Sequence, residues 1–137
     1  MRRLSTRLSL IGLAGLLAVA IPAGYAINYA QARNDLQQKA AALTGGDPMR
    51  GKALVSRYGC GGCHAISGVP QAAGRVGPPL SGIGSRSYLA GRLENRPENM
   101  VRWIVDPRGV DAETAMPAVG VTPRDGRDIA AFLYTLS

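Results

Sequence analysis

The chain contains a single histidine, two cysteines, one tryptophan and one phenylalanine among its 137 residues, and aromatic residues make up only 5% of it. Structural zinc sites use four ligands, mostly cysteine and histidine, and a copper-binding domain needs several such residues, so the sequence argues against both. So few large side chains also leave a thin hydrophobic core for one small domain. A bound group is therefore expected to help fill that core.

The charges are predominantly basic, with 16 Lys and Arg against 9 Asp and Glu. Arg2, Arg3 and Arg7 precede the first apolar run, which leaves 13 basic against 9 acidic residues for the remainder. A nucleic-acid-binding protein is expected to show a basic stripe with interleaved aromatic residues. Here the basic residues are scattered among acidic ones, and the pattern argues against nucleic acid as a partner.

Residues 8–32 form a run of 25 residues without a formal charge. As a helix the run would be about 37 Å long, enough to cross a ~30 Å hydrocarbon core, and the preceding arginines would keep the amino terminus in the cytoplasm. We expect residues 1–32 to be a membrane anchor or uncleaved signal segment of a bacterial inner membrane, with the rest in the periplasm. Against this, Pro22 could end the helix early, and Ala30-Gln31-Ala32 has the form of a cleavage site that would release a soluble periplasmic protein.

The remainder predicts an all-α domain. A helical stalk or linker over 33–45 ends at a Gly-Gly pair, and the globular domain should occupy 46–137. Within it, Asp47-Pro48 should start a helix that runs to about Tyr58, and Pro97-Glu98 one that ends at Asp106-Pro107. Thr122-Pro123 should cap the last helix, while residues 59–91 and 108–121 are expected to be loop.

All the thiol and imidazole groups of the chain fall within Cys60-Gly61-Gly62-Cys63-His64. Thiols at i and i+3 can form thioether links with two vinyl groups of a porphyrin, while the next imidazole reaches the iron. A thioredoxin-like redox pair would need a strand and helix around it that the sequence lacks, and a disulfide would leave His64 unexplained. The motif predicts one haem c, attached through Cys60 and Cys63 with His64 as an iron ligand.

The second axial ligand of that iron cannot be another histidine, because there is none. Methionine is the next candidate, and Met116, in a loop before Pro117, is best placed to be the second metal ligand. Met100 should pack in the core, since it lies three residues from Trp103 on a helical face. The alternative is that Met116 also merely packs.

In its motifs, the sequence from about Gly46 to the end resembles the class I c-type cytochromes: CGGCH, then Gly77-Pro78-Pro79-Leu80, then Trp103, then Ala115-Met116-Pro117 and a closing helix with Phe132. The resemblance implies three to four helices wrapped on one haem. It also implies that the Pro78 carbonyl accepts a hydrogen bond from the His64 imidazole and that Leu80 packs on the haem. Arg86 and Trp103 would approach the propionates, and Gly51 would allow close contact with Phe132.

A narrower likeness rests on four segments taken together, which are similar to the cytochrome c domain fused to subunit II of some haem-copper oxidases. They are Gly77-Pro78-Pro79-Leu80, Ala90-Gly91-Arg92-Leu93-Glu94-Asn95, Pro97-Glu98-Asn99-Met100 and Met116-Pro117. The likeness points to a terminal oxidase as electron acceptor. Our leading hypothesis is an electron-transfer protein, not an enzyme, that receives electrons from quinol-cytochrome c reductase or a dehydrogenase. Two alternatives stay open. One is an integral cytochrome subunit of an oxidase or dehydrogenase complex, and the other is a haem protein that binds small ligands or acts as a peroxidase.

Overall fold

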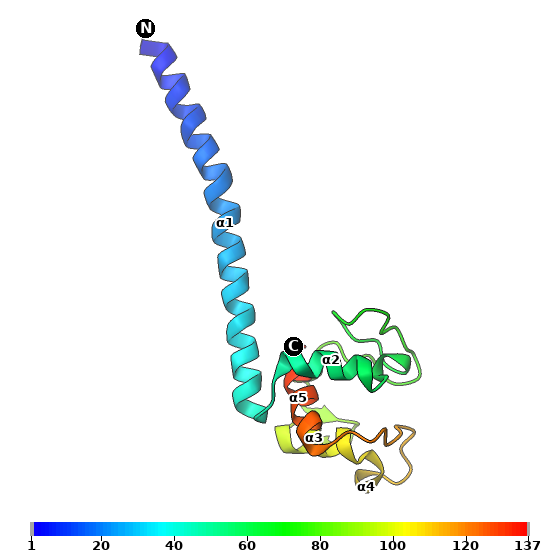
Figure 1. Ribbon diagram of the computed structural model, residues 1–137. Helices are drawn as coiled ribbons and strands as arrows, with labels where there is room; N and C mark the ends of the chain where they lie inside the picture. Colours follow the sequence, from blue (N-terminus) through cyan, green and yellow to red (C-terminus); the bar gives the residue numbers. More distant parts are fainter. Residues whose placement is uncertain (1, 137) are drawn as a thin grey trace. The chain divides into compact units, whose positions relative to one another are not determined.

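The computed structural model describes the backbone of residues 2–136 and the side chains of residues 15–136. Its helices are α1 (Arg2–Thr44), α2 (Pro48–Arg57), α3 (Pro97–Val105), α4 (Pro107–Val110) and α5 (Pro123–Tyr134) (Figure 1). Two 3₁₀ turns, η1 (Cys60–Gly62) and η2 (Ile83–Ser85), and two antiparallel two-residue strands, β1 (Tyr88–Leu89) and β2 (Leu93–Glu94), complete it. The predicted all-α class is confirmed, and a small hairpin accompanies the helices.

The amino-terminal unit, up to Asp35, is the first part of α1. The helix continues through Pro22, so the proline does not end it. Among the residues whose side chains are described, no helix is both long and apolar enough to cross a membrane. The first part of the predicted anchor, residues 1–14, lies outside those residues.

The second unit, from Leu36 onward, contains the last turns of α1 and the globular domain. Ala40 and Thr44 on α1 are buried there. The predicted starts of two helices are confirmed, because the Asp47 carboxylate accepts from Met49 N–H at 2.8 Å and Thr122 Oγ1 accepts from Asp125 N–H at 3.1 Å. Such caps satisfy amide groups that the first turn leaves without a helical partner.

The prediction of a continuous loop between α3 and α5 is wrong over its first residues, where the short helix α4 forms. Asp106 ends α3 as predicted, but its carboxylate also accepts from Gly109 N–H at 2.9 Å and so caps α4. One aspartate therefore ends one helix and begins the next.

The core joins α2, α3 and α5 to residues of the intervening loops. Its buried apolar side chains include Met100, which is 2% exposed and packs as predicted, and the only phenylalanine. The cluster comprises Leu54, Val55, Ile66, Val69, Ile83, Leu89, Met100, Ile104, Val121, Ile129, Ala130, Phe132 and Leu133.

The helices α2 and α5 cross in close contact at Gly51. A Cβ on Gly51 would collide with the backbone of Asp128 and Ile129, so only glycine fits there. Phe132, to which the resemblance assigned this contact, lies one turn further along α5 and is buried in the core. The Asp128 side chain, 3% exposed, pairs with the Arg50 guanidinium and accepts from Asp47 N–H at 2.8 Å. The Asp128 carboxylate thus binds both Arg50 and the backbone of Asp47, the residue that caps α2.

We expect Asp128→Ala to lower the free energy of unfolding by about 2 to 3 kcal/mol, because it removes a buried carboxylate that accepts from Asp47 N–H and pairs with Arg50. Chemical denaturation of the purified protein measures this loss. Glu113→Ala, which removes an exposed carboxylate, is the control and should change stability by less than about 0.5 kcal/mol. Equal stabilities for the two variants would contradict a structural role for Asp128.

Candidate functional site

The two cysteines lie on a 3₁₀ turn. Gly59, with a left-handed φ of +71°, precedes η1, and Cys63 N–H donates to Cys60 O at 3.2 Å. Residues i and i+3 eclipse one another in a 3₁₀ turn, so both cysteine side chains leave the same face of it. Both thiols are free and half-buried. The turn therefore presents two sulfur atoms to one side.

Burial raises the pKa of the Cys60 thiol. A thiol of this kind carries little thiolate at neutral pH and is a poor nucleophile in disulfide exchange. The environment therefore opposes the alternative of a thioredoxin-like redox pair.

His64 follows directly, and its ring has a defined proton position. The Nδ1 atom lies 2.7 Å from the carbonyl oxygen of Pro78. A carbonyl oxygen can only accept a hydrogen bond, so Nδ1 carries the proton and donates it. Nε2 then holds a lone pair, which is the form of imidazole that binds a metal.

Three backbone hydrogen bonds hold the residues after the motif beside the motif itself. The N–H groups of residues 74, 77 and 80 donate to the carbonyls of residues 61, 63 and 65 at 2.9 to 3.0 Å. Gly77 lies directly behind the imidazole, since a Cβ there would come within 2.7 Å of His64 Nδ1. The close approach of these two segments brings the Pro78 carbonyl within hydrogen-bond distance of His64 Nδ1.

Met116 lies half-buried in the irregular segment between α4 and α5. Its N–H donates to Thr114 Oγ1 at 3.2 Å, and Thr114 N–H donates to Asp111 O at 3.1 Å. Asp111 pairs with Arg92 from the β1–β2 turn at 3.0 Å. In Figure 1 this segment and the loop after α2 both extend to the right of α5.

The other predicted residues lie at varied depths. Leu80 is half-buried and packs against the core. Trp103 is half-buried on α3 between the buried Met100 and Ile104. Arg86 follows η2, and its Nη2 donates to Pro79 O at 2.6 Å and Ser81 O at 3.0 Å. The guanidinium therefore holds backbone carbonyls of the segment that contacts His64.

Asn95 was not predicted as a site residue, yet its amide contacts the same region. It donates to Ile83 O at 2.8 Å and to Arg86 O at 2.7 Å. These partners are backbone carbonyls 9 and 12 residues earlier, which no local sequence pattern reveals.

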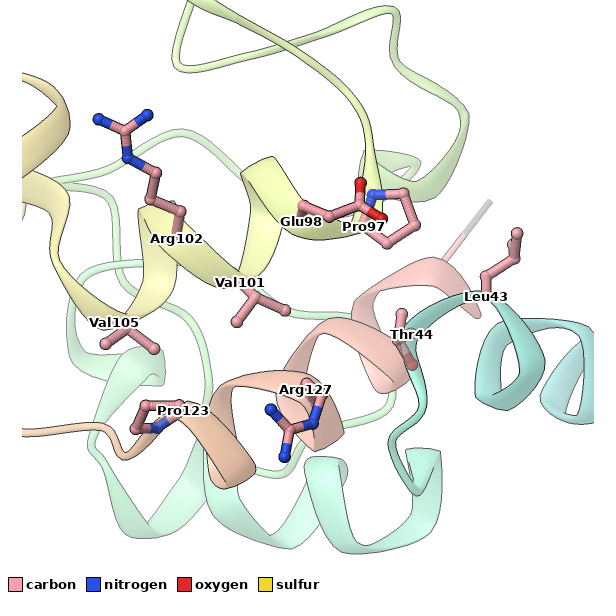
Figure 2. Close-up of a pocket in the computed structure, with 9 residues that line it drawn as sticks. All are labelled: Leu43, Thr44, Pro97, Glu98, Val101, Arg102, Val105, Pro123 and Arg127. Atoms are coloured by element: carbon pink, nitrogen blue, oxygen red, sulfur yellow. The ribbon is translucent and has the colours of Figure 1, made fainter.

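A shallow groove of about 420 Å³ lies apart from these residues (Figure 2). The end of α1, one side of α3 and the start of α5 line it, with apolar Val101 and Val105 beside charged Arg102 and Arg127. None of Cys60, Cys63, His64 and Met116 borders it, so the groove is separate from the candidate site.

The donor set of the site fits covalently attached haem. Two free thiols leave one face of a turn, and the adjacent imidazole has the tautomer that coordinates iron through Nε2. A haem would also add apolar volume to a domain whose core contains one phenylalanine.

Comparison with known proteins agrees with this chemistry. The family described as cytochrome c matches residues 48–137. Cytochrome c oxidase subunit 2 of Alkalihalophilus pseudofirmus is 35% identical over 88 residues, which cover 64% of this chain and 25% of that protein. Cytochrome c oxidase subunit 2 of Bacillus sp. strain PS3 is 37% identical over 68 residues, which cover 47% of this chain and 19% of that protein. The chain therefore spans about a quarter or less of the curated relatives it matches.

We expect Gly77→Ala to lower the stability of the haem-loaded protein by about 2 kcal/mol, because the added methyl group displaces either the imidazole or the loop behind it. Denaturation followed by haem absorbance, together with the haem content per polypeptide, measures the effect. Gly62→Ala is the matched control inside the motif, since a Cβ there meets no atom within 4 Å. If Gly77→Ala and Gly62→Ala had the same stability and haem content, the close packing of Gly77 against His64 would not contribute to stability.

Proposed function

This chain belongs to the cytochrome c family, and on that premise we propose that it carries single electrons in a respiratory chain to a terminal cytochrome oxidase. The observation that carries the proposal is the His64 imidazole, whose Nδ1–H donates to Pro78 O beside two free thiols. When bound, haem c supplies a reversible one-electron couple. The donor would be quinol-cytochrome c reductase or a dehydrogenase.

The protein's own residues favour electron transfer over ligand binding. The Pro78 carbonyl keeps the His64 ring in one tautomer and orientation, and the backbone bonds around Gly77 limit its movement. We propose that Met116 is the second iron ligand, leaving no open position for a small molecule. Fixed ligands on both sides keep structural change small when the charge on the iron changes.

The oxidase partner is supported by the two relatives, both of which are named cytochrome c oxidase subunit 2. We propose a separate electron donor to the oxidase as the first candidate. The second candidate is a fixed subunit of an oxidase, favoured by the fact that the similar segment in those relatives is part of a subunit.

We propose further that the amino-terminal segment holds the haem domain at the periplasmic face of a bacterial inner membrane. The support is in the sequence alone: 25 uncharged residues after three arginines. A tether would raise the effective concentration of the carrier near a membrane-bound oxidase. Cleavage near Ala32, giving a soluble periplasmic carrier, is the competing proposal.

We expect carbon monoxide to leave the visible spectrum of the reduced protein unchanged and to bind rapidly to Met116→Ala, because loss of the thioether opens the sixth position. The variant should also have a lower reduction potential, since methionine ligation raises it. Met49→Ala, which removes an exposed methionine, should behave as the wild type. Carbon monoxide binding by the unaltered protein would instead favour a ligand-binding or peroxidase function.

We expect membranes washed with alkaline carbonate to retain the haem-carrying polypeptide and to reoxidise it with oxygen in a cyanide-sensitive reaction. Haem staining of both fractions and the decay of the reduced band measure this. Haem recovered in the wash would contradict the membrane anchor but not the oxidase partner. Retention of the haem without cyanide-sensitive reoxidation would contradict the oxidase partner but not the anchor.

Extraction of the membranes with a mild detergent then distinguishes a fixed oxidase subunit from a separate carrier. A fixed subunit is extracted in complex with the oxidase, and a carrier is extracted without it.

A further inference from the structure

Asn95, just after β2, uses both ends of its side-chain amide. Its Nδ2 donates to Ile83 O and Arg86 O, and its Oδ1 accepts from Tyr134 OH at 2.8 Å. Burial, together with the charge of Glu98, raises the pKa of the Tyr134 phenol, so this hydroxyl remains a donor at neutral pH. One amide therefore connects the end of α5 to both ends of η2.

The turn η2 is also held from the side of α5. Gly84 N–H donates to Leu136 O at 3.2 Å, and a Cβ on Gly84 would come within 2.8 Å of Tyr134 O. The contact with α5 on one side and the Asn95 amide on the other fix the backbone from Ile83 to Arg86. The Arg86 side chain therefore starts from a defined position.

From that position the guanidinium of Arg86 reaches the carbonyls of Pro79 and Ser81, on either side of Leu80. The carbonyl immediately before this pair is that of Pro78, which accepts the His64 Nδ1 proton. A continuous chain of bonds thus runs from Tyr134 through Asn95 and Arg86 to the imidazole.

We propose that Asn95 is a positioning residue for the iron ligand His64. By fixing Arg86, it keeps the Pro78 carbonyl in line with the imidazole proton. A well-aligned acceptor increases the basicity of the ring and stabilises the oxidised iron. Loss of the Asn95 amide therefore weakens the His64–Pro78 bond and favours the reduced state. This inference rests on His64 as the haem ligand in the proposed function, and it does not depend on which oxidase accepts the electron.

The test compares Asn95→Ala and Tyr134→Phe with the control Asn99→Ala in purified, haem-loaded protein. Asn99 is of the same type and four residues away, but within the described part of the chain its amide donates to Glu94 O alone, at 3.0 Å. NMR of the reduced protein measures solvent exchange of the His64 Nδ1 proton, and redox titration measures the reduction equilibrium. Neither measurement requires an oxidase, so failure of the respiratory role leaves this test intact.

For Asn95→Ala we expect proton exchange to accelerate at least tenfold and the reduction equilibrium to shift about threefold toward the reduced state, or about 28 mV at 59 mV per tenfold. Tyr134→Phe, which removes one hydroxyl and keeps the ring, should change the exchange rate and the reduction equilibrium in the same direction, but by less. This variant also tests the proposal if Asn95→Ala does not fold. The proposal would be overturned if Asn95→Ala had the same His64 Nδ1 proton exchange rate and the same reduction potential as Asn99→Ala. A loss of stability in Asn95→Ala without these changes would mean that Asn95 only supports the fold.

Discussion

The crossing of α2 over α5 at Gly51 and Asp128 is the contact on which the rest of the domain depends. Since no side chain separates the two backbones there, the position of one helix determines that of the other. The amino end of α2 is fixed by the Asp128 carboxylate, and its carboxyl end leads directly into Cys60. The far end of α5 contacts η2 through Gly84. A single helix crossing therefore orients both the cysteine turn and the support of Arg86.

Between these helices the chain has little regular structure, and backbone hydrogen bonds between loops take its place. The glycines at 74 and 77 allow one loop to lie against the next without an intervening side chain, so that the N–H groups reach carbonyls of the attachment motif. These bonds pair amide groups that have no partner in a regular helix or strand. The glycine-rich composition thus permits close loop packing around a large apolar cofactor.

The features that the sequence predicts are those determined by neighbouring residues. Asp47-Pro48 and Thr122-Pro123 start helices because cap and proline act within one turn. The helix α4 was not predicted, because Asp106 both ends α3 and caps α4 and because α4 (Pro107–Val110) is only a single turn. The β1–β2 hairpin was missed because each strand has two residues and Ala90, at φ +49°, occupies a turn position where alanine is uncommon. The role of Asn95 depends on residues distant in sequence and could not be predicted.

The segments that carry His64 and Met116 are held by different means, and this asymmetry has a physical consequence. The His64 segment bonds to a second segment at three backbone positions, and its neighbours reach the core through Ile66 and Val69. In the described part of the chain, the hydrogen bonds of residues 112–120 reach back no further than Asp111, which pairs with an Arg92 side chain that is 58% exposed. An ion pair with one partner so exposed to solvent adds little stability. In the proposed ligand pair, detaching Met116 therefore disturbs one loop, whereas detaching His64 requires the three backbone hydrogen bonds between the loops to break. The segment that carries His64 is thus held more firmly than the segment that carries Met116.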